Sequence, residues 1–209
     1  MAIIDMHTNQ ISGKVGSNVY YVRNGKQLMR RKPARRKTEP SILELRHRSQ
    51  FAFITKFLLP LNPLFHQTFK SRDLVPFNKA VSVNFNHVIP ESYPDWRVDF
   101  SKLLLGQGYV SGLRDLSVSV DIPGHLKFSW NGKFRGKGAV GHDQVYVAVY
   151  CENLNQWLLR LNACSRKNGS LIIDAGLFSG DSVHVYLGLT SDFWEGSSDG
   201  QYLGSVEIL

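Results

Sequence analysis

The last hundred residues contain the feature that most constrains the fold of this chain, a succession of short segments in which apolar and polar residues alternate. Turn signals such as Pro123-Gly124 and Asn168-Gly169 separate these segments. Short strands of this number and spacing are typical of two antiparallel β-sheets packed face to face. The segments are Leu116–Ile122, Leu126–Asn131, Gln144–Cys151, Trp157–Asn162, Ser170–Asp174, Ser182–Leu189 and Tyr202–Ile208. We therefore expect residues 111–209 to form an immunoglobulin- or fibronectin-like antiparallel β-sandwich.

The alternation also predicts which residues form the sandwich core. Val145, Val147 and Val149 recur at every second position, which gives that strand one apolar face. The pattern in Ser182–Leu189 is the same. Trp130 follows Phe128 at the same spacing, so we expect both side chains to be buried.

Residues 1–110 predict a different organisation, so the chain as a whole is expected to be α+β with a boundary between about Leu105 and Leu116. Val19–Val22 are strand formers, and Asn24-Gly25 is a strong signal for a two-residue hairpin turn. Ser41 and Glu44 have the spacing of a capping box at the start of a helix, which Pro60 would end. Two shorter helices are expected after Pro63 and over 77–85.

Charge is distributed unevenly along the chain. The 209 residues carry a net charge of +8, yet residues 1–80 alone contain 15 lysines and arginines against 4 aspartates and glutamates, a net +11. Nine basic residues and no acidic one lie between Lys14 and Lys37. Exposed faces usually mix both signs, so this asymmetry indicates an anionic partner.

The run from Arg30 to Lys37 is predicted to be an extended arm, since Pro33 interrupts regular structure. Arginine contacts phosphate through two parallel hydrogen bonds, which favours RNA or DNA as the partner. An acidic protein surface and a merely solubilising arm remain alternatives. The candidate nucleic-acid-binding residues are Lys14, Arg23, Lys26, Arg30, Arg31, Lys32, Arg35, Arg36, Lys37, Arg46 and Arg48.

Signatures of catalysis or of a bound cofactor are missing from the sequence. It has no G-x-S-x-G, phosphate-binding loop, H-E-x-x-H or C-x-x-C pattern. A histidine next to an aspartate is common by chance, so we do not assign a catalytic role to His142 and Asp143. Cys151 and Cys164 are expected to be unpaired thiols. We therefore expect no enzymatic activity, no metal and no cofactor.

The expected location is the cytoplasm, or a particle assembled there, without membrane insertion. Residues 1–10 have no basic region or apolar core of signal-peptide length. The longest apolar stretch, Phe51–Phe65, is interrupted by Lys56, Pro60 and Pro63 and is too short to span a bilayer. Phe193 and Trp194 in a glycine- and serine-rich loop could mark a contact site, although packing under the sandwich is favoured.

Several short motifs resemble those of an uncharacterised bacterial family of basic proteins about 200 residues long, catalogued only as a domain of unknown function. They are S-G-K-V-G-x-x-V from Ser12, a basic residue three before Pro33, R-x-x-F from Arg48, F-N-x-A from Phe77, Asp99–Lys102, and G-D-x-V-x-x-Y-x-G from Gly180. The resemblance extends over nearly the whole chain. It implies one recurring architecture and no assigned activity, and the arm is richer in arginine and lysine than the family pattern.

Two hypotheses from different classes follow. In the first, the chain is a binding protein whose basic arm and helix face grip a polyanion, RNA or DNA within a nucleoprotein particle. In the second, it is a structural subunit of a large protein assembly, such as a phage particle or a secretion machine, with its N-terminal segment laced into neighbours. The oligomeric state is left open by the sequence.

Overall fold

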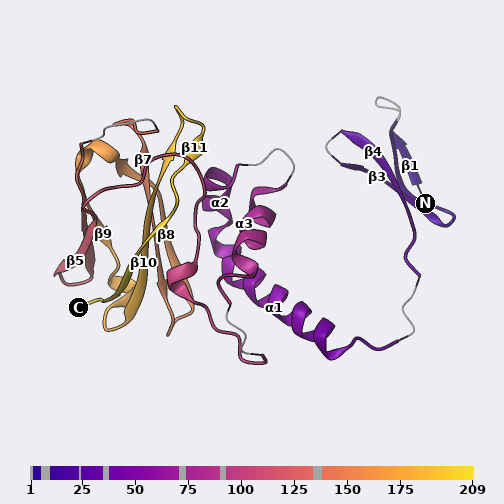
Figure 1. The fold of residues 1–209 in the computed structure, drawn as a ribbon, viewed down its shortest axis with the longest axis horizontal. Coiled ribbons are helices and arrows are strands. Elements are labelled where there is room, and N and C mark those ends of the chain that lie inside the picture. Colours follow the sequence, from indigo (N-terminus) through magenta and orange to yellow (C-terminus); the bar gives the residue numbers. More distant parts are fainter. Residues whose placement is uncertain are drawn as a thin grey trace. The chain divides into compact units, whose positions relative to one another are not determined.

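The computed structural model describes residues 2–5, 10–23, 25–34, 38–70, 74–89, 93–133 and 138–209 (Figure 1). The chain divides into two compact units, Met1–Ser41 and Ile42–Leu209. This division differs from the boundary expected near residue 110. The reason is that the helices share a core with the sandwich, as described below.

The first unit is a small antiparallel sheet of four strands in the order β1-β2-β3-β4. The strands are β1 (Ala2–Asp5), β2 (Gln10–Val15), β3 (Asn18–Arg23) and β4 (Lys26–Arg31). Gly16 and Gly25 occupy the turns on either side of β3 with φ of +57° and +72°, a conformation that side chains with a Cβ rarely adopt.

The arm predicted to start at Arg30 begins later. Arg30 and Arg31 belong to β4, where they pair with Val19 and Asn18 of β3. The backbone N–H of Lys32 still donates to the carbonyl of Ser17 at 2.7 Å. These ladder hydrogen bonds hold the first basic residues in a sheet. The rest of the predicted arm, 35–37, lies outside the described residues, as does Asn24 of the predicted hairpin turn.

The second unit opens with helices that begin or end at prolines. Pro60, Pro63 and Pro76 each occupy the first turn of an element, where the missing N–H has no helical partner to lose. The elements are α1 (Ile42–Leu58), the 3-10 turn η1 (Leu59–Leu61), α2 (Asn62–Thr68) and α3 (Pro76–Phe85). Apolar and polar residues alternate in part of the segment Val98–Leu105, a pattern typical of a strand, but the segment contains the 3-10 turn η2 (Phe100–Lys102) instead.

The β-sandwich is present, and each of the seven predicted segments contains a strand. One sheet has the order β5-β6-β9, and the other runs β11-β10-β7-β8 with β12 also paired to β10. Short 3-10 turns, η3 (Arg166–Asn168) and η4 (Gly176–Phe178), lie on either side of β9. The strands are β5 (Ser117–Ile122), β6 (His125–Ser129), β7 (Gln144–Cys151), β8 (Gln156–Ser165), β9 (Ser170–Asp174), β10 (Ser182–Ser191), β11 (Gly196–Ser197) and β12 (Gln201–Glu207).

Two hydrophobic cores lie on opposite faces of the larger sheet. Val145, Val147 and Val149 of β7 pack with the smaller sheet in one core. Tyr146 and Ala148, the residues between them, are fully buried in a second core with the helices. Figure 1 shows the helices on one side of β7, β8 and β10, and β5 and β9 on the other. The expectation of one apolar face for this strand is therefore wrong, since helices cover the other face.

Candidate functional site

The register of the N-terminal sheet gathers four basic side chains on one face. Cross-strand partners point to the same side of a sheet. Arg23 is the partner of Lys26, and Val19 is the partner of both Lys14 and Arg30. Lys14, Arg23, Lys26 and Arg30 are all exposed, and we call them the basic face.

Aromatic and aliphatic surface lies between the charges of the basic face. Tyr21 is the partner of Leu28, and this pair sits between the Arg23–Lys26 pair and the Val19–Arg30 pair. Each side chain is 37% exposed. A phenol ring between cations is a surface on which a base or sugar can stack while the cations contact phosphate.

The basic face carries an electrostatic cost when nothing is bound. Like charges directly opposite one another across a strand pair are destabilising, and Arg23 faces Lys26 in this way. Strands β2, β3 and β4 contain no aspartate or glutamate, and Asp5 of β1, which pairs with Gln10 of β2, is the acidic residue that this sheet includes. A polyanion laid over this face would remove the repulsion.

The other predicted basic residues are not all brought to this face. Arg31 lies on the opposite face of the sheet, together with Tyr20 and Met29. Lys32 lies just after the end of β4. Arg46 and Arg48 lie on α1 in the second unit, the former half-buried and the latter exposed. Arg35, Arg36 and Lys37 lie outside the described residues. The structure thus places four of the eleven candidates on one face of the sheet.

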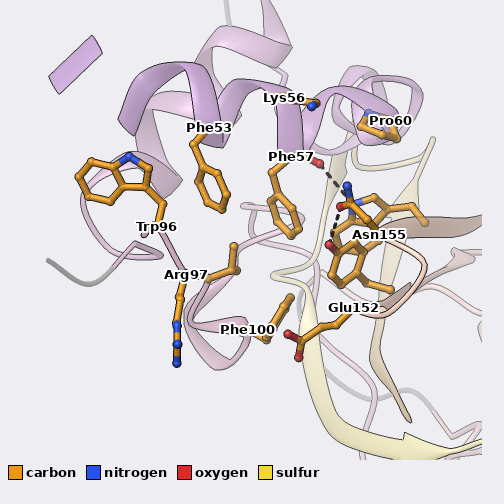
Figure 2. Close-up of a pocket in the computed structure, with 12 residues that line it drawn as sticks. Phe53, Lys56, Phe57, Pro60, Trp96, Arg97, Phe100, Glu152 and Asn155 are labelled. Atoms are coloured by element: carbon orange, nitrogen blue, oxygen red, sulfur yellow. Dashed lines mark hydrogen bonds between the residues drawn. The ribbon is translucent and has the colours of Figure 1, made fainter. Parts of the chain in front are cut away.

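Sequence reasoning missed an aromatic groove in the second unit, shown in Figure 2. The groove has a volume of about 700 Å³ and lies between α1, the segment before η2, and the β7–β8 hairpin. Its lining comprises Phe53, Lys56, Phe57, Pro60, Trp96, Arg97, Val98, Phe100, Tyr150, Glu152, Asn155 and Trp157. Only the spacing of Phe53 and Phe57, one helical turn apart, could have indicated a shared face.

Hydrogen bonds to the polar atoms of the rings fix the groove walls. The indole N–H of Trp96 donates to Ser49 Oγ at 3.1 Å, and that of Trp157 donates to the carbonyl of Phe57 at 3.2 Å. The Tyr150 hydroxyl donates to Asn155 Oδ1 at 2.8 Å. The rings of Phe57, Tyr150 and Trp157 also contact one another, with centroids 4.8–5.4 Å apart. The walls are therefore rigid before any ligand arrives.

One end of the groove adjoins a chain of polar contacts through His184. Its Nε2 donates to Glu152 Oε1 at 2.7 Å, and its Nδ1 lies 2.8 Å from the hydroxyl of Tyr202. Phe100 stacks on the imidazole with centroids 3.7 Å apart. Desolvation, with the nearby Glu152 and Asp99 carboxylates, raises the pKa of Tyr202. The hydroxyl, imidazole and carboxylate thus form a hydrogen-bonded row at this end of the groove.

Asp143, considered above beside His142, forms a buried ion pair. Its Oδ2 accepts from Arg166 Nε at 3.0 Å and from the backbone N–H of Val140 at 2.9 Å. The Arg166 guanidinium also donates to the carbonyls of Gly112 and Ser111. Through Arg166, this pair connects η3 to the segment that precedes β5, at Ser111 and Gly112. Its role is structural.

Two further findings concern only the described part of the chain. No group of three histidine, cysteine, aspartate or glutamate side chains there is arranged to hold a metal ion. Among the same residues, no helix combines the length and apolarity needed to cross a membrane. Cys151 and Cys164 are both free thiols.

Comparisons with known proteins give a family and some distant structural neighbours. A family model described as "Family of unknown function (DUF6266)" matches residues 10–204. No curated protein matches the sequence. Among solved structures, the fn3 domain of human collagen alpha-1(XX) chain is 15% identical with a TM-score of 0.33, covering 49% of this chain and 89% of that one. The fn3 domain of human contactin 1 is 8% identical with a TM-score of 0.35, covering 49% and 82%.

Proposed function

We propose, for a chain that belongs to the family of unknown function DUF6266 and inherits no activity from a relative, that it is a non-catalytic binding protein whose N-terminal sheet grips RNA or DNA. The observation that carries the proposal is the basic face, where four exposed cations surround Tyr21 and Leu28 on one side of a sheet. The absence of acidic residues from 10–34 supports it.

The basic face is suited to contact the sugar–phosphate backbone rather than to read sequence. Lysine and arginine neutralise phosphates and release condensed counterions, and such contacts carry no base information. With four contacts and about 0.7–0.9 counterions released per contact, the logarithm of the affinity should fall against the logarithm of salt concentration with a slope of about −3. The rest of the arm would add to this value.

The test is a fluorescence titration of single- and double-stranded oligonucleotides at several salt concentrations. Changing Lys14, Arg23, Lys26 and Arg30 together to Ser should flatten the slope by about 3 and weaken binding to unrelated sequences alike. A matched control changes four exposed cations of the second unit to Ser and should leave the slope unchanged: Arg114, Lys133, Arg160 and Lys167.

Two results would refute the proposal. The first is no binding by the unaltered chain at low salt. The second is an equal loss of slope in the control, because the effect would then come from net charge and not from the basic face.

A structural subunit of a large assembly is the second candidate, and exposed apolar surface favours it. Val15 and Met29 of the N-terminal sheet are 51% and 59% exposed. Ile42 and Leu43 at the start of α1 are about three-quarters exposed. The first pair lies in the first unit and the second pair in the second unit, and exposed apolar residues that lie together within a unit indicate a surface that another protein covers. Ordered self-assembly in sedimentation velocity, together with no oligonucleotide binding, would favour this candidate over the first.

A further inference from the structure

We propose that the aromatic groove of the second unit is a nucleotide-binding site, in which a base stacks on the rings and a phosphate contacts Arg97 or Lys56. The groove belongs entirely to the second unit, so its existence does not depend on the basic face. The choice of a nucleotide among flat anions rests on the proposed function, in which the chain binds nucleic acid.

The aromatic walls of the groove favour a flat ligand. Phe53, Phe57, Trp96, Phe100 and Trp157 are all half-buried, so part of each ring lies open. The indole N–H groups of Trp96 and Trp157 are already bonded within the protein, which leaves ring faces and edges for the ligand. A volume of about 700 Å³ lies within the range of small-ligand sites. Stacking on aromatic side chains accepts any base, because every base has a π-face.

The positive charges of Lys56 and Arg97 at the rim of the groove favour an anionic ligand. Lys56 and Arg97 are exposed, and no salt bridge joins either of them to a carboxylate among the described residues. The one carboxylate in the lining, Glu152, is already bonded to His184. The lining thus contains two cations that have no carboxylate partner in the described part of the chain and one carboxylate that already has a partner, which favours a negatively charged ligand. Arginine in particular presents a planar fork that matches phosphate.

The placement of the two cations indicates how a strand would lie. Figure 2 shows Phe53 and Phe57 projecting from α1, with Lys56 on the helix and Arg97 on the segment that carries Trp96, its side chain extending away from α1. One phosphate therefore meets one cation at a time. In a single strand, the phosphates on the two sides of a stacked nucleotide could meet both. A free nucleotide and a nucleotide within a strand share this chemistry, and the strand should bind more tightly.

The experiment titrates the full chain with AMP, adenosine and inorganic phosphate, and with single-stranded (dT)8, by isothermal calorimetry. AMP should bind, and more tightly than adenosine or phosphate alone. Arg97→Gln and Lys56→Gln should together weaken AMP about tenfold or more and leave adenosine unchanged, because a hydrogen-bonded charge is lost. Phe53→Ala should weaken both ligands. In the variant with the four serine changes on the basic face, (dT)8 is compared with its own mononucleotide, TMP. Tighter binding of (dT)8 there identifies the strand as the source, and equal affinity identifies the free nucleotide.

Matched controls separate the site from general effects. Arg160→Gln removes an exposed arginine of β8, and Phe193→Ala removes a ring that is 74% exposed. Neither should change AMP affinity. Thermal melts confirm that each groove variant is folded, and Phe53→Leu provides a milder change if Phe53→Ala unfolds.

Three results would overturn the inference: no AMP binding at millimolar concentration, equal affinity for adenosine and AMP, or unchanged AMP affinity in the Arg97→Gln/Lys56→Gln variant. The four serine changes on the basic face should leave AMP binding intact. If the unaltered chain bound AMP but no oligonucleotide duplex, the proposed function alone would be refuted, and duplex binding without AMP binding would refute the groove alone.

Discussion

Removing the carboxylate of Asp143 should destabilise the second unit more than any surface ion-pair change. Its side chain is fully buried, and that of Arg166 is 4% exposed. Asp143 Oδ1 has no hydrogen-bond partner among the described residues, so the contact with Arg166 is the main compensation for burying the charge. Asp143→Ala leaves the guanidinium buried with only the Gly112 and Ser111 carbonyls as acceptors.

The magnitude follows from breaking a buried pair by removing one partner, which costs about 3–5 kcal/mol. For a domain of this size each kcal/mol lowers the melting temperature by about 2–4 °C, so the expected fall is roughly 6–20 °C. The double change Asp143→Ala/Arg166→Met removes both charges. It should be less destabilising than the sum of the two single changes, with a coupling of about 1–3 kcal/mol.

The assay is urea unfolding followed by tryptophan fluorescence, because Trp130 donates its indole N–H to the carbonyl of Arg166 and reports on this region. The matched control is Asp121→Ala, which removes a carboxylate paired with Lys127 at 2.7 Å with both side chains nearly half exposed. The control should leave the unfolding midpoint within error. An Asp143→Ala variant no less stable than the control would refute the reasoning.

Two further predictions concern the sandwich. Trp130→Ala should cost about 3–5 kcal/mol, because the ring is buried in the core and loses its hydrogen bond, whereas Phe193→Ala should melt as the unaltered chain does. Burial raises the pKa of the Cys164 thiol to about 11 from 9.0. The neutral thiol therefore favours the fold below about pH 9, and this contribution is lost as pH rises through 11. Iodoacetamide at pH 8.5 should alkylate Cys164 roughly seventyfold more slowly in the folded chain than in urea, since the thiolate fraction is lower; equal rates would contradict the raised pKa.

The sandwich strands could be predicted because their limits depend on local signals. Gly124 and Gly169 have φ of +71° and +73° in the turns beside β6 and β9, where a glycine after proline or asparagine indicated the break. β11 is only two residues long and pairs with the end of β10. A strand that short has no period, so the sequence offered no signal for it.

The helical layer over the larger sheet was missed although the sequence contained evidence for it. From Val145 to Cys151 every residue is apolar, including Tyr146, Ala148 and Tyr150. A strand with one face in water alternates with polar residues, whereas an unbroken apolar run is typical of a strand buried on both faces. The apolar second half of α1, with Ile54 and Leu58 now buried, provided the matching surface.

The candidate sites differ in how far they could be predicted. A two-residue turn after Arg23 implies that Arg23 pairs with Lys26, so the basic face could have been deduced from the predicted hairpin. The groove could not, because Phe57, Trp96 and Trp157 come from separate segments. Their proximity depends on how α1 crosses the sheet, and no local pattern specifies that crossing.

The groove exists because the helical layer covers the larger sheet unevenly. The hydroxyl of Tyr186 on β10 donates a hydrogen bond to the carbonyl of Phe100 at 2.7 Å, which holds η2 against the larger sheet. Phe57 packs on Tyr150 and Trp157 from the other side. Phe53 lies one turn earlier on α1, where no aromatic ring of the described residues packs against it, and its side chain lines the groove instead. The same contacts that bury Tyr186 and Ala148 thus leave aromatic surface uncovered at the edge of the core, and the planar ligand that we propose would bind there without displacing any of them.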